Sequence, residues 1–290
     1  MDDQQTYLLN GLLTRHFGLG RIVRFRSVRR GHEAEAFELF TAGEREYLVQ
    51  LYPAHYTEEQ LSLTARALAL LDEHRFTVVP LIRSKGGEHF VEGPQGTRMC
   101  VSVAPQGSAL LPEAYTEHDV SQVGLRLGWM HRLLKERLPA PEVPPDPVAL
   151  LRAEGITLHE PLVGLLRLPT MSGWTHGDIQ AEALLHDGDH QLRTVMDWGL
   201  LHWGCPMTDL VDAFLGIAMA ADRGDSSRGK ALLEAYDTLV PIKRMAWTPV
   251  VAWWAARRML SHKTRPLPMG FHERLILAPE RLATAIASCM

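Results

Sequence analysis

The stretch that decides the fold runs from Trp174 to Trp198 and reads WTHGDIQAEALLHDGDHQLRTVMDW. It contains an apolar segment from Ala183 to His186, a polar turn, and a second apolar segment that ends at Asp197. Asp, Gly and His between two short apolar segments predict a β-hairpin. The strands of a hairpin lie side by side, so we expect Asp178, before the first strand, and Asp197 at the same end.

Two converging carboxylates suit the transfer of a phosphoryl group to a hydroxyl. One accepts the proton of the attacking hydroxyl, and the other holds Mg²⁺ on the phosphates of a nucleotide. Asp178 is the candidate base and Asp197 the candidate metal ligand. An ordinary hairpin with surface acids is the alternative interpretation.

The order H-G-D, strand, turn and M-D-W resembles the family of aminoglycoside phosphotransferases and choline-kinase-like enzymes. In that family the catalytic loop reads H-G-D-x-x-x-x-N and the metal-binding strand ends in I-D-W or I-D-F. The later segment GCPMTDL resembles the family's G-D-P-x-x-D-L. The resemblance implies that Asp178 is the catalytic base, that His176 and Asp209 brace its loop, and that Asp197 binds the metal.

Composition sets the broad class. With 290 residues, 46% hydrophobic and 22% charged, the chain is long enough for two lobes with sizeable cores. A net charge of −4 argues against a broad basic face for nucleic acid. The sequence shows no apolar run of the roughly 20 residues that a membrane span needs. The polar start MDDQQTY is unlike a signal peptide, so we expect a cytoplasmic location.

The cysteines are too few and too scattered for a disulfide framework or a zinc site. We expect Cys100, Cys205 and Cys289 to be reduced thiols.

Local patterns predict the order of elements. Helical patterns cover residues 4–17, 57–74, 117–135, 209–221, 226–239, 248–262 and 271–288. Strand patterns cover residues 22–28, 34–40, 47–52, 78–83, 89–91 and 97–103. Together with the resemblance, this order implies an α+β, two-lobed protein-kinase-like fold. The N-terminal lobe (1–104) is an antiparallel sheet that binds nucleotide, and the mostly helical C-terminal lobe (105–290) carries the catalytic loop and the acceptor pocket.

The resemblance also implies a site for ATP and Mg²⁺. It places Arg30 and Gly31 in the loop over the phosphates, and Ser102 and Ala104 at the hinge that receives adenine through backbone groups. Gln50 stands on the third strand, where the family has a Lys or Arg that binds phosphate. A neutral amide cannot supply that charge-assisted bond. An inward turn of Arg29 or Arg30 is one hypothesis for restoring the charge.

Other positions also depart from the family pattern. Ala34 and Ala183 replace asparagines, and Cys205 replaces an aspartate. Glu182, Gln180 or an extra water are candidates to complete the metal shell. Two functions therefore stay open. One is an ATP-dependent phosphotransferase acting on a hydroxyl of an unidentified small molecule. The other is a catalytically impaired pseudokinase, with or without nucleotide, that serves as a binding or regulatory protein for a protein partner.

Four further groups favour structural interpretations. His131 is expected to be a satisfied core histidine. The arginines of the first strand are expected to be a solvated face, and the HDGDH turn (186–190) is not expected to be a metal site. The group Trp247, Trp253, Trp254, Arg257, Arg258 and Lys263 suits an anionic or aromatic acceptor, although a packed helix with a solvated basic side is favoured.

Overall fold

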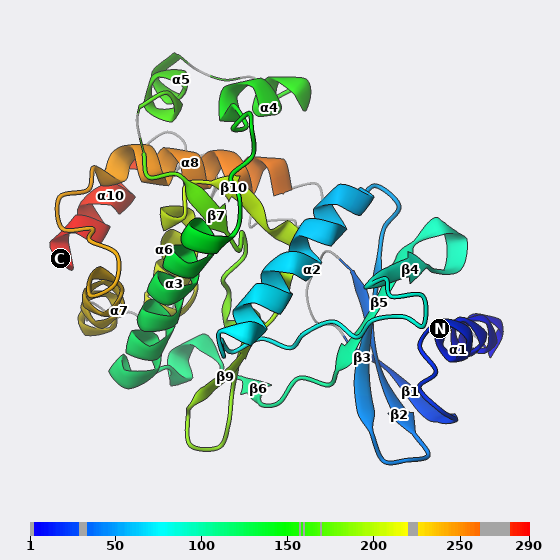
Figure 1. Ribbon diagram of the computed structural model, residues 1–290. Coiled ribbons are helices and arrows are strands. Elements are labelled where there is room, and N and C mark those ends of the chain that lie inside the picture. Colours follow the sequence, from blue (N-terminus) through cyan, green and yellow to red (C-terminus); the bar gives the residue numbers. More distant parts are fainter. Residues whose placement is uncertain are drawn as a thin grey trace. The chain divides into compact units, whose positions relative to one another are not determined.

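The computed structural model describes residues 3–28, 34–156, 158, 160–168, 170–219, 226–261 and 279–290. The chain divides into two compact units, residues 1–109 with 182–200, and residues 110–181 with 201–290. The first unit is built on a sheet and the second is mostly helical (Figure 1), which confirms the predicted α+β class. The predicted lobe boundaries, 1–104 and 105–290, stay predictions.

The elements of the first unit are α1 (Asp3–His16), β1 (Ile22–Val28), β2 (Glu35–Thr41), β3 (Glu46–Tyr52), α2 (Glu58–Glu73), β4 (Phe90–Glu92), β5 (Arg98–Val103), β6 (Ser108–Ala109), β8 (Leu184–His186) and β9 (Leu192–Val195). Those of the second unit are α3 (Glu117–Arg137), α4 (Pro147–Ala153), α5 (Glu160–Leu166), β7 (Gly173–Thr175), β10 (His202–Gly204), α6 (Met207–Ala213), the π-helical turn η5 (Phe214–Ala218), α7 (Ser227–Asp237), α8 (Trp247–Ser261) and α10 (Pro279–Ser288).

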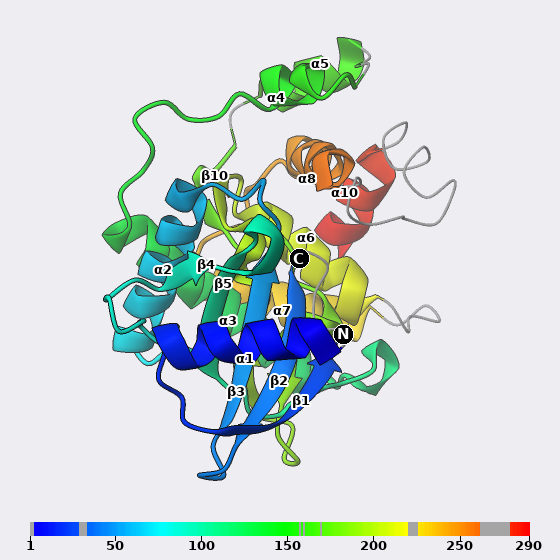
Figure 2. The same ribbon diagram turned by 90° about the vertical axis from the view of Figure 1, so that its right-hand side faces the viewer.

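Five strands form an antiparallel sheet in the order β1-β2-β3-β5-β4. Alternate residues of its central strand, β3, are buried on one face, as the two-residue period of a strand requires. There Tyr47, Val49 and Leu51 share a core with Leu9 and Leu13 of α1. Figure 2 shows α1 crossing this face of the sheet.

The opposite face of β3 packs against two other elements of the same unit. Leu48 lies in a cluster with Leu185 and Met196 of the hairpin. Tyr52 lies in a cluster with Leu61 of α2. Because successive side chains of β3 point to opposite faces, one face packs against α1 and the other against the hairpin and α2.

Helix α2 begins at a capping box. The Thr57 hydroxyl accepts a hydrogen bond from the Gln60 amide at 3.2 Å, and the Gln60 side chain accepts one from the Thr57 amide at 3.0 Å. These bonds satisfy two of the backbone donors that a helix start leaves open. The predicted helix start at Thr57 is confirmed.

The predicted hairpin is present, because β8 and β9 pair antiparallel. Its turn is closed by Asp187, whose carboxylate accepts the amides of Asp189 and Gln191, each at 2.9 Å. Arg193 also donates to Asp187, at 2.7 Å. The carboxylate of Asp187 therefore stabilises the turn.

In the second unit, helix α8 contacts α4, α5, α6 and α10 (Figure 1). Helices α3 and α7 pack closely at Gly124, where an added Cβ would lie 2.3 Å from the Leu232 carbonyl oxygen. The short strands β7 and β10 pair antiparallel. This pairing fixes the start of the loop that follows Thr175.

Some predicted elements differ from the structure. Residues 78–83 form no strand, and Leu81 alone makes an isolated bridge to Ser102. The helix predicted at 209–221 begins at Met207 and changes to π-helical geometry at Phe214. Helices α4 and α5 were not predicted. Of the helix predicted at 271–288, residues 271–278 lie outside the described part of the chain.

The structure describes all three cysteines. Cys100, Cys205 and Cys289 are all buried free thiols. Among the described residues, no helix has the length and apolar character needed to cross a bilayer.

Candidate active site

The loop His176-Gly177-Asp178 follows β7 and is clamped by one buried carboxylate. Asp209, in the first turn of α6, accepts the amide of His176 at 2.7 Å and that of Gly177 at 2.8 Å. Gly177 has a φ of +91°, a conformation that favours glycine. The brace that the resemblance implies for Asp209 is therefore present.

A histidine shares in this clamp. His131 is buried, contacts Asp209 through Nε2 at 2.9 Å, and contacts the Tyr236 hydroxyl through Nδ1 at 2.8 Å. Burial alone would raise the pKa of Asp209. The hydrogen bond and charge of His131, with His176 and the Gly177 amide, lower that pKa below its usual value. The prediction of a satisfied core histidine is confirmed.

His176 lies inside the protein with no exposed surface. Its Nδ1 accepts a hydrogen bond from the amide of Asp178 at 3.3 Å. The ring therefore supports the turn that presents Asp178 and does not itself face solvent.

The carboxylate of Asp178 contacts Arg258, an arginine that was expected on a solvated side of its helix. Arg258 of α8 donates from Nη1 to Asp178 at 3.0 Å, and the two side chains are 6% and 8% exposed. Arg258 also donates to Asp212 through Nε at 3.1 Å and through Nη2. Trp254, one turn earlier on α8, donates to the same Asp212 oxygen at 2.6 Å.

The expected solvated basic side of α8 is therefore wrong for Arg258. Two carboxylates, Asp178 and Asp212, compensate the desolvation of its guanidinium. A signal was present in the sequence: Asp212 is an acid within the apolar run of 207–218, and such an acid requires a buried partner. The sequence did not reveal which partner it has.

Within this cluster, the environment disfavours the charge of Asp212 and favours that of Arg258. Burial raises the pKa of Asp212 to about 7; the Arg258 guanidinium opposes the increase and the charge of Asp178 reinforces it. The carboxylates raise the pKa of Arg258 against the effect of burial, so the guanidinium stays charged. Arg258 thus holds Asp178 in one orientation by a charge-assisted bond.

In the first unit, Gln50, Ser102 and Asp197 line one narrow cavity of about 20 Å³, together with Thr64 and Leu68 of α2. That volume has room for about one water. The α2 side chains that line the cavity are neutral. A basic residue at position 50 would find no acid on this face of α2.

Asp197 is half-buried at the end of the hairpin and has a φ of +63°. Few non-glycine residues adopt this left-handed conformation, although aspartate tolerates it better than most. Such backbone conformations cluster at functional sites. The geometry is therefore consistent with the predicted role of Asp197 and was not visible in the sequence.

The remaining predicted site residues lie apart from this cavity or outside the described residues. Glu182 is exposed, beside the buried Ala183. Ala104 follows β5 directly, and its amide donates to Glu46 at 3.0 Å. Arg30 and Gly31 lie outside the described part of the chain.

Within the described residues, no group of three or more His, Cys, Asp or Glu side chains is placed to hold a metal. A carboxylate oxygen such as that of Asp197 nevertheless suits Mg²⁺, which keeps several waters and needs few protein ligands. Asp178 belongs to the second unit and Asp197 to the first. Their convergence stays a prediction.

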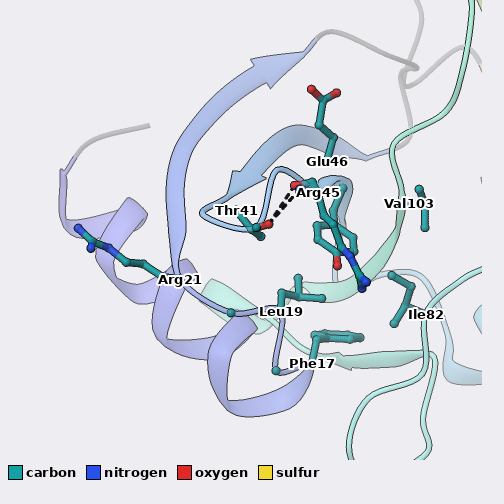
Figure 3. Close-up of a pocket in the computed structure, with 12 residues that line it drawn as sticks. Phe17, Leu19, Arg21, Thr41, Arg45, Glu46, Ile82 and Val103 are labelled. Atoms are coloured by element: carbon teal, nitrogen blue, oxygen red, sulfur yellow. Dashed lines mark hydrogen bonds between the residues drawn. The ribbon is translucent and has the colours of Figure 1, made fainter.

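A second cavity of the first unit, of about 840 Å³, contains none of the predicted site residues. It is lined by residues of the segment after α1 and of the β2–β3 turn. Figure 3 shows the Arg45 side chain between Leu19 and Ile82.

Comparisons with known proteins identify the chain's relatives. Residues 24–247 match the phosphotransferase enzyme family. A solved amicoumacin kinase, hAmiN, in complex with AMP-PNP, Ca²⁺ and Ami aligns with a TM-score of 0.69 at 13% identity, over 99% of this chain and 94% of its own. A comparison with curated proteins gives no match.

Two further solved structures have similar folds. The microcompartment-associated aminopropanol kinase aligns with a TM-score of 0.66 at 16% identity, over 98% of this chain and 95% of its own. Choline kinase LicA from Streptococcus pneumoniae aligns with a TM-score of 0.63 at 12% identity, over 99% and 100%. Identities this low establish a shared fold and leave the substrate open.

Proposed function

The chain belongs to the phosphotransferase enzyme family and has its protein-kinase-like fold, and from this premise we propose that it transfers a phosphoryl group from ATP to a hydroxyl of a small molecule. The observation that carries the proposal is the clamped loop. Asp209 holds the amides of His176 and Gly177, and Arg258 holds the carboxylate of Asp178. These buried charged contacts hold the loop in one conformation, which a loop without a function would not require.

In the proposed reaction, Asp178 accepts the proton of the acceptor hydroxyl as that oxygen attacks the γ-phosphorus of ATP. The bond from this phosphorus to the β–γ bridging oxygen breaks, and ADP leaves. Arg258 is a positioning residue, because it fixes the carboxylate without itself being assigned a contact to substrate. Positioning of this kind supplies much of the rate in phosphoryl transfer.

Asp197 is the proposed ligand of Mg²⁺ on the nucleotide. The ion would neutralise charge on the β and γ phosphates. Ser102 and Ala104 are proposed to lie by the adenine, Arg30 and Gly31 by the phosphates, and Glu182 by the metal. Dependence on cellular ATP supports a cytoplasmic location.

One observation favours a second candidate function, a pseudokinase that binds a protein partner. Gln50 shares its cavity with Thr64 and Leu68 of α2. Among the described residues that line this cavity, position 50 offers no basic side chain and α2 offers no acidic partner for one. Loss of that charge-assisted contact weakens the hold on phosphate. Ala183 likewise offers no oxygen to a metal.

Thermal unfolding with Mg²⁺ and ATP separates the two candidates. A ligand at ~100 times its dissociation constant stabilises the folded state by about 2.7 kcal/mol, which raises the midpoint by a few degrees. The proposal expects such a rise in the natural protein, its loss in Asp197→Ala, and its retention in Asp189→Ala. Asp189 is the matched control because it is an exposed acid in the turn of the same hairpin.

A midpoint that does not respond to Mg²⁺ and ATP would refute nucleotide-dependent transfer and favour the binding protein. A rise that survives in Asp197→Ala would place the metal ligand elsewhere. With nucleotide binding established, phosphate release or transfer to candidate alcohols tests the chemistry, and Asp178→Asn should abolish it while leaving the midpoint shift in place.

A further inference from the structure

The partly open cavity of about 840 Å³ in the first unit lies at the edge of the core between α1 and the sheet (Figure 3). Phe17 and Tyr47, two buried members of that core, line the cavity. Leu19 and Ile82, which are partly buried against the same core, line it as well. Small-molecule pockets commonly have volumes of about 300–1,000 Å³. The cavity therefore has the size of a ligand site and an apolar surface that a ligand would cover.

Hydrogen bonds within the chain hold the walls of this cavity in place. The Arg21 carbonyl accepts the amide of Ala42 at 2.8 Å, which joins the segment after α1 to the β2–β3 turn. Within that turn, the Arg45 carbonyl accepts the Thr41 amide at 3.0 Å, and the Thr41 hydroxyl accepts the Arg45 amide at 3.3 Å. Binding to walls that are already fixed costs little ordering of the chain.

Arg45 is the charged side chain that lies against the apolar lining. Figure 3 shows it between Leu19 and Ile82. The side chains of Arg21 and Glu46 point away from these residues in the same view. The hydrogen bonds of Arg45 involve its backbone, and its guanidinium has no hydrogen-bond or ion-pair partner among the residues that the structure describes. The guanidinium is thus available to a ligand.

A small amphipathic anion matches this combination of groups. Its apolar part would remove the surface of the lining from water, which is favourable. Its acidic group would accept two parallel hydrogen bonds from the planar guanidinium of Arg45, which is always charged and can only donate. An organic cation would meet repulsion from Arg45, and an uncharged molecule would gain the apolar contribution alone.

This cavity and the proposed nucleotide site lie on opposite faces of β5. Val103 lines the cavity and is 54% exposed. Its neighbour Ser102 lines the narrow cavity of Gln50 and Asp197. Successive side chains of a strand point to opposite faces, so a ligand in contact with Val103 would leave the face of Ser102 unoccupied.

We propose that this cavity is a second ligand site, separate from the proposed nucleotide site, and that it binds a small amphipathic carboxylate. The apolar part lies against Phe17, Leu19 and Ile82, and the carboxylate pairs with Arg45. The site goes beyond phosphoryl transfer, and binding there does not depend on that function.

The test is a calorimetric titration of the full chain, without nucleotide, with three probes of similar chain length: octanoate, 1-octanol and octyltrimethylammonium. We expect octanoate to bind more tightly than 1-octanol, and the cation to bind most weakly. Arg45→Gln should weaken octanoate binding by about tenfold, the loss expected for a charge-assisted hydrogen bond, and leave 1-octanol nearly unchanged. Val103→Glu should weaken the binding of both, because it places a carboxylate in the apolar lining.

Arg66→Gln and Val23→Glu are the matched controls. Each makes the same substitution at an exposed residue of the same unit that does not line the cavity. Both should bind octanoate as the natural protein does, and circular dichroism establishes that each variant is folded.

Absence of octanoate binding at millimolar concentration would overturn the proposal. So would an octanoate affinity that Arg45→Gln and Val103→Glu leave unchanged, or equal losses in these variants and their controls. Binding of octyltrimethylammonium as tight as that of octanoate would show that Arg45 does not select the ligand and would equally overturn it. The response to Mg²⁺ and ATP is measured separately, so failure of this site and failure of nucleotide binding give different results.

Discussion

At the scale of single residues, Arg258 forms two buried ion pairs in the second unit. Its guanidinium lies between the carboxylates of Asp178 and Asp212, and all three side chains are less than one tenth exposed. A buried carboxylate without a cation is strongly unfavourable. The stability of this region is therefore tied to the residue that positions the candidate base.

Arg258→Met keeps a long side chain and removes the charge, so it leaves two buried carboxylates uncompensated. We expect the free energy of unfolding at pH 7.5 to fall by about 3–5 kcal/mol, as for other broken buried pairs. Urea denaturation measures it. Arg132→Met, which breaks an exposed pair with Glu136, should cost about 0.3–0.5 kcal/mol. Similar losses in both variants would show that the buried cluster adds little.

Asp212 gives the second prediction at this scale. Its pKa in the folded protein is about 7, above the ordinary value of 3.8. The folded chain therefore binds this proton more tightly than the unfolded chain does. The contribution of Asp212 to the free energy of unfolding falls as the pH rises from about 4 to about 7.

Asp212→Asn removes that titration and keeps an oxygen for Trp254 and Arg258. The natural protein should lose stability relative to Asp212→Asn as the pH rises through this window, and above pH 7 the difference should become constant. Thermal midpoints of both proteins across the window provide the measurement. A difference that is independent of pH, or that moves in the opposite direction, would contradict the elevated pKa.

At the scale of elements, the contact between α3 and α7 depends on the absence of a side chain at Gly124. A Cβ there would lie 2.3 Å from the Leu232 carbonyl oxygen and 3.1 Å from the Ala235 Cβ. Gly124→Ala should therefore destabilise the protein by about 1–3 kcal/mol through overpacking. Gly164→Ala in α5, where nothing lies within 4 Å of the added Cβ, should be neutral or stabilise by up to about 1 kcal/mol. Chemical denaturation of both variants compares them, and equal effects would mean that the helices separate to accept the methyl group.

The elements also show what the sequence could and could not predict. The hairpin around Asp187 and the start of α2 at Thr57 follow from local turn and cap chemistry, which is encoded within a few residues. Helices α4 and α5 were missed because they are short and follow a proline-rich connector that reads as extended chain. The strand predicted at 78–83 is apolar but lacks a partner along its length, so only Leu81 pairs.

The residues of the candidate site likewise include some that local sequence predicts and one, Arg258, that it does not. Motif spacing predicts Asp178, Asp197 and Asp209 as site residues, since these acids occur at motif positions in one stretch of chain. Arg258 lies 80 residues from Asp178, and no local pattern relates the two. Contacts between residues so far apart depend on how the helices pack, which a single sequence does not specify.

At the scale of the whole molecule, nucleotide binding depends on whether the sheet can hold phosphate without a cation on β3. Gln50 lies in a narrow cavity with Thr64, Leu68 and Asp197, and Asp197 is the only acid among the described residues that line it. A lysine introduced there would meet no competing acid from α2. It would be available to the phosphates of a nucleotide whose metal Asp197 is proposed to hold.

Gln50→Lys should therefore raise the affinity for Mg²⁺ and ATP by about tenfold, because a charge-assisted hydrogen bond is roughly twice as strong as a neutral one and the difference is of the order of 1.4 kcal/mol. Titration calorimetry with a non-hydrolysable ATP analogue measures the affinity without turnover. Gln191→Lys adds the same charge in the exposed hairpin turn and should change it little. If Gln50→Lys leaves the affinity unchanged while the natural protein binds, the phosphates do not reach β3, and another cation, such as Arg29 or Arg30, holds them. If both lysine variants gain equally, the gain reflects the net charge of the chain and not a specific contact at position 50.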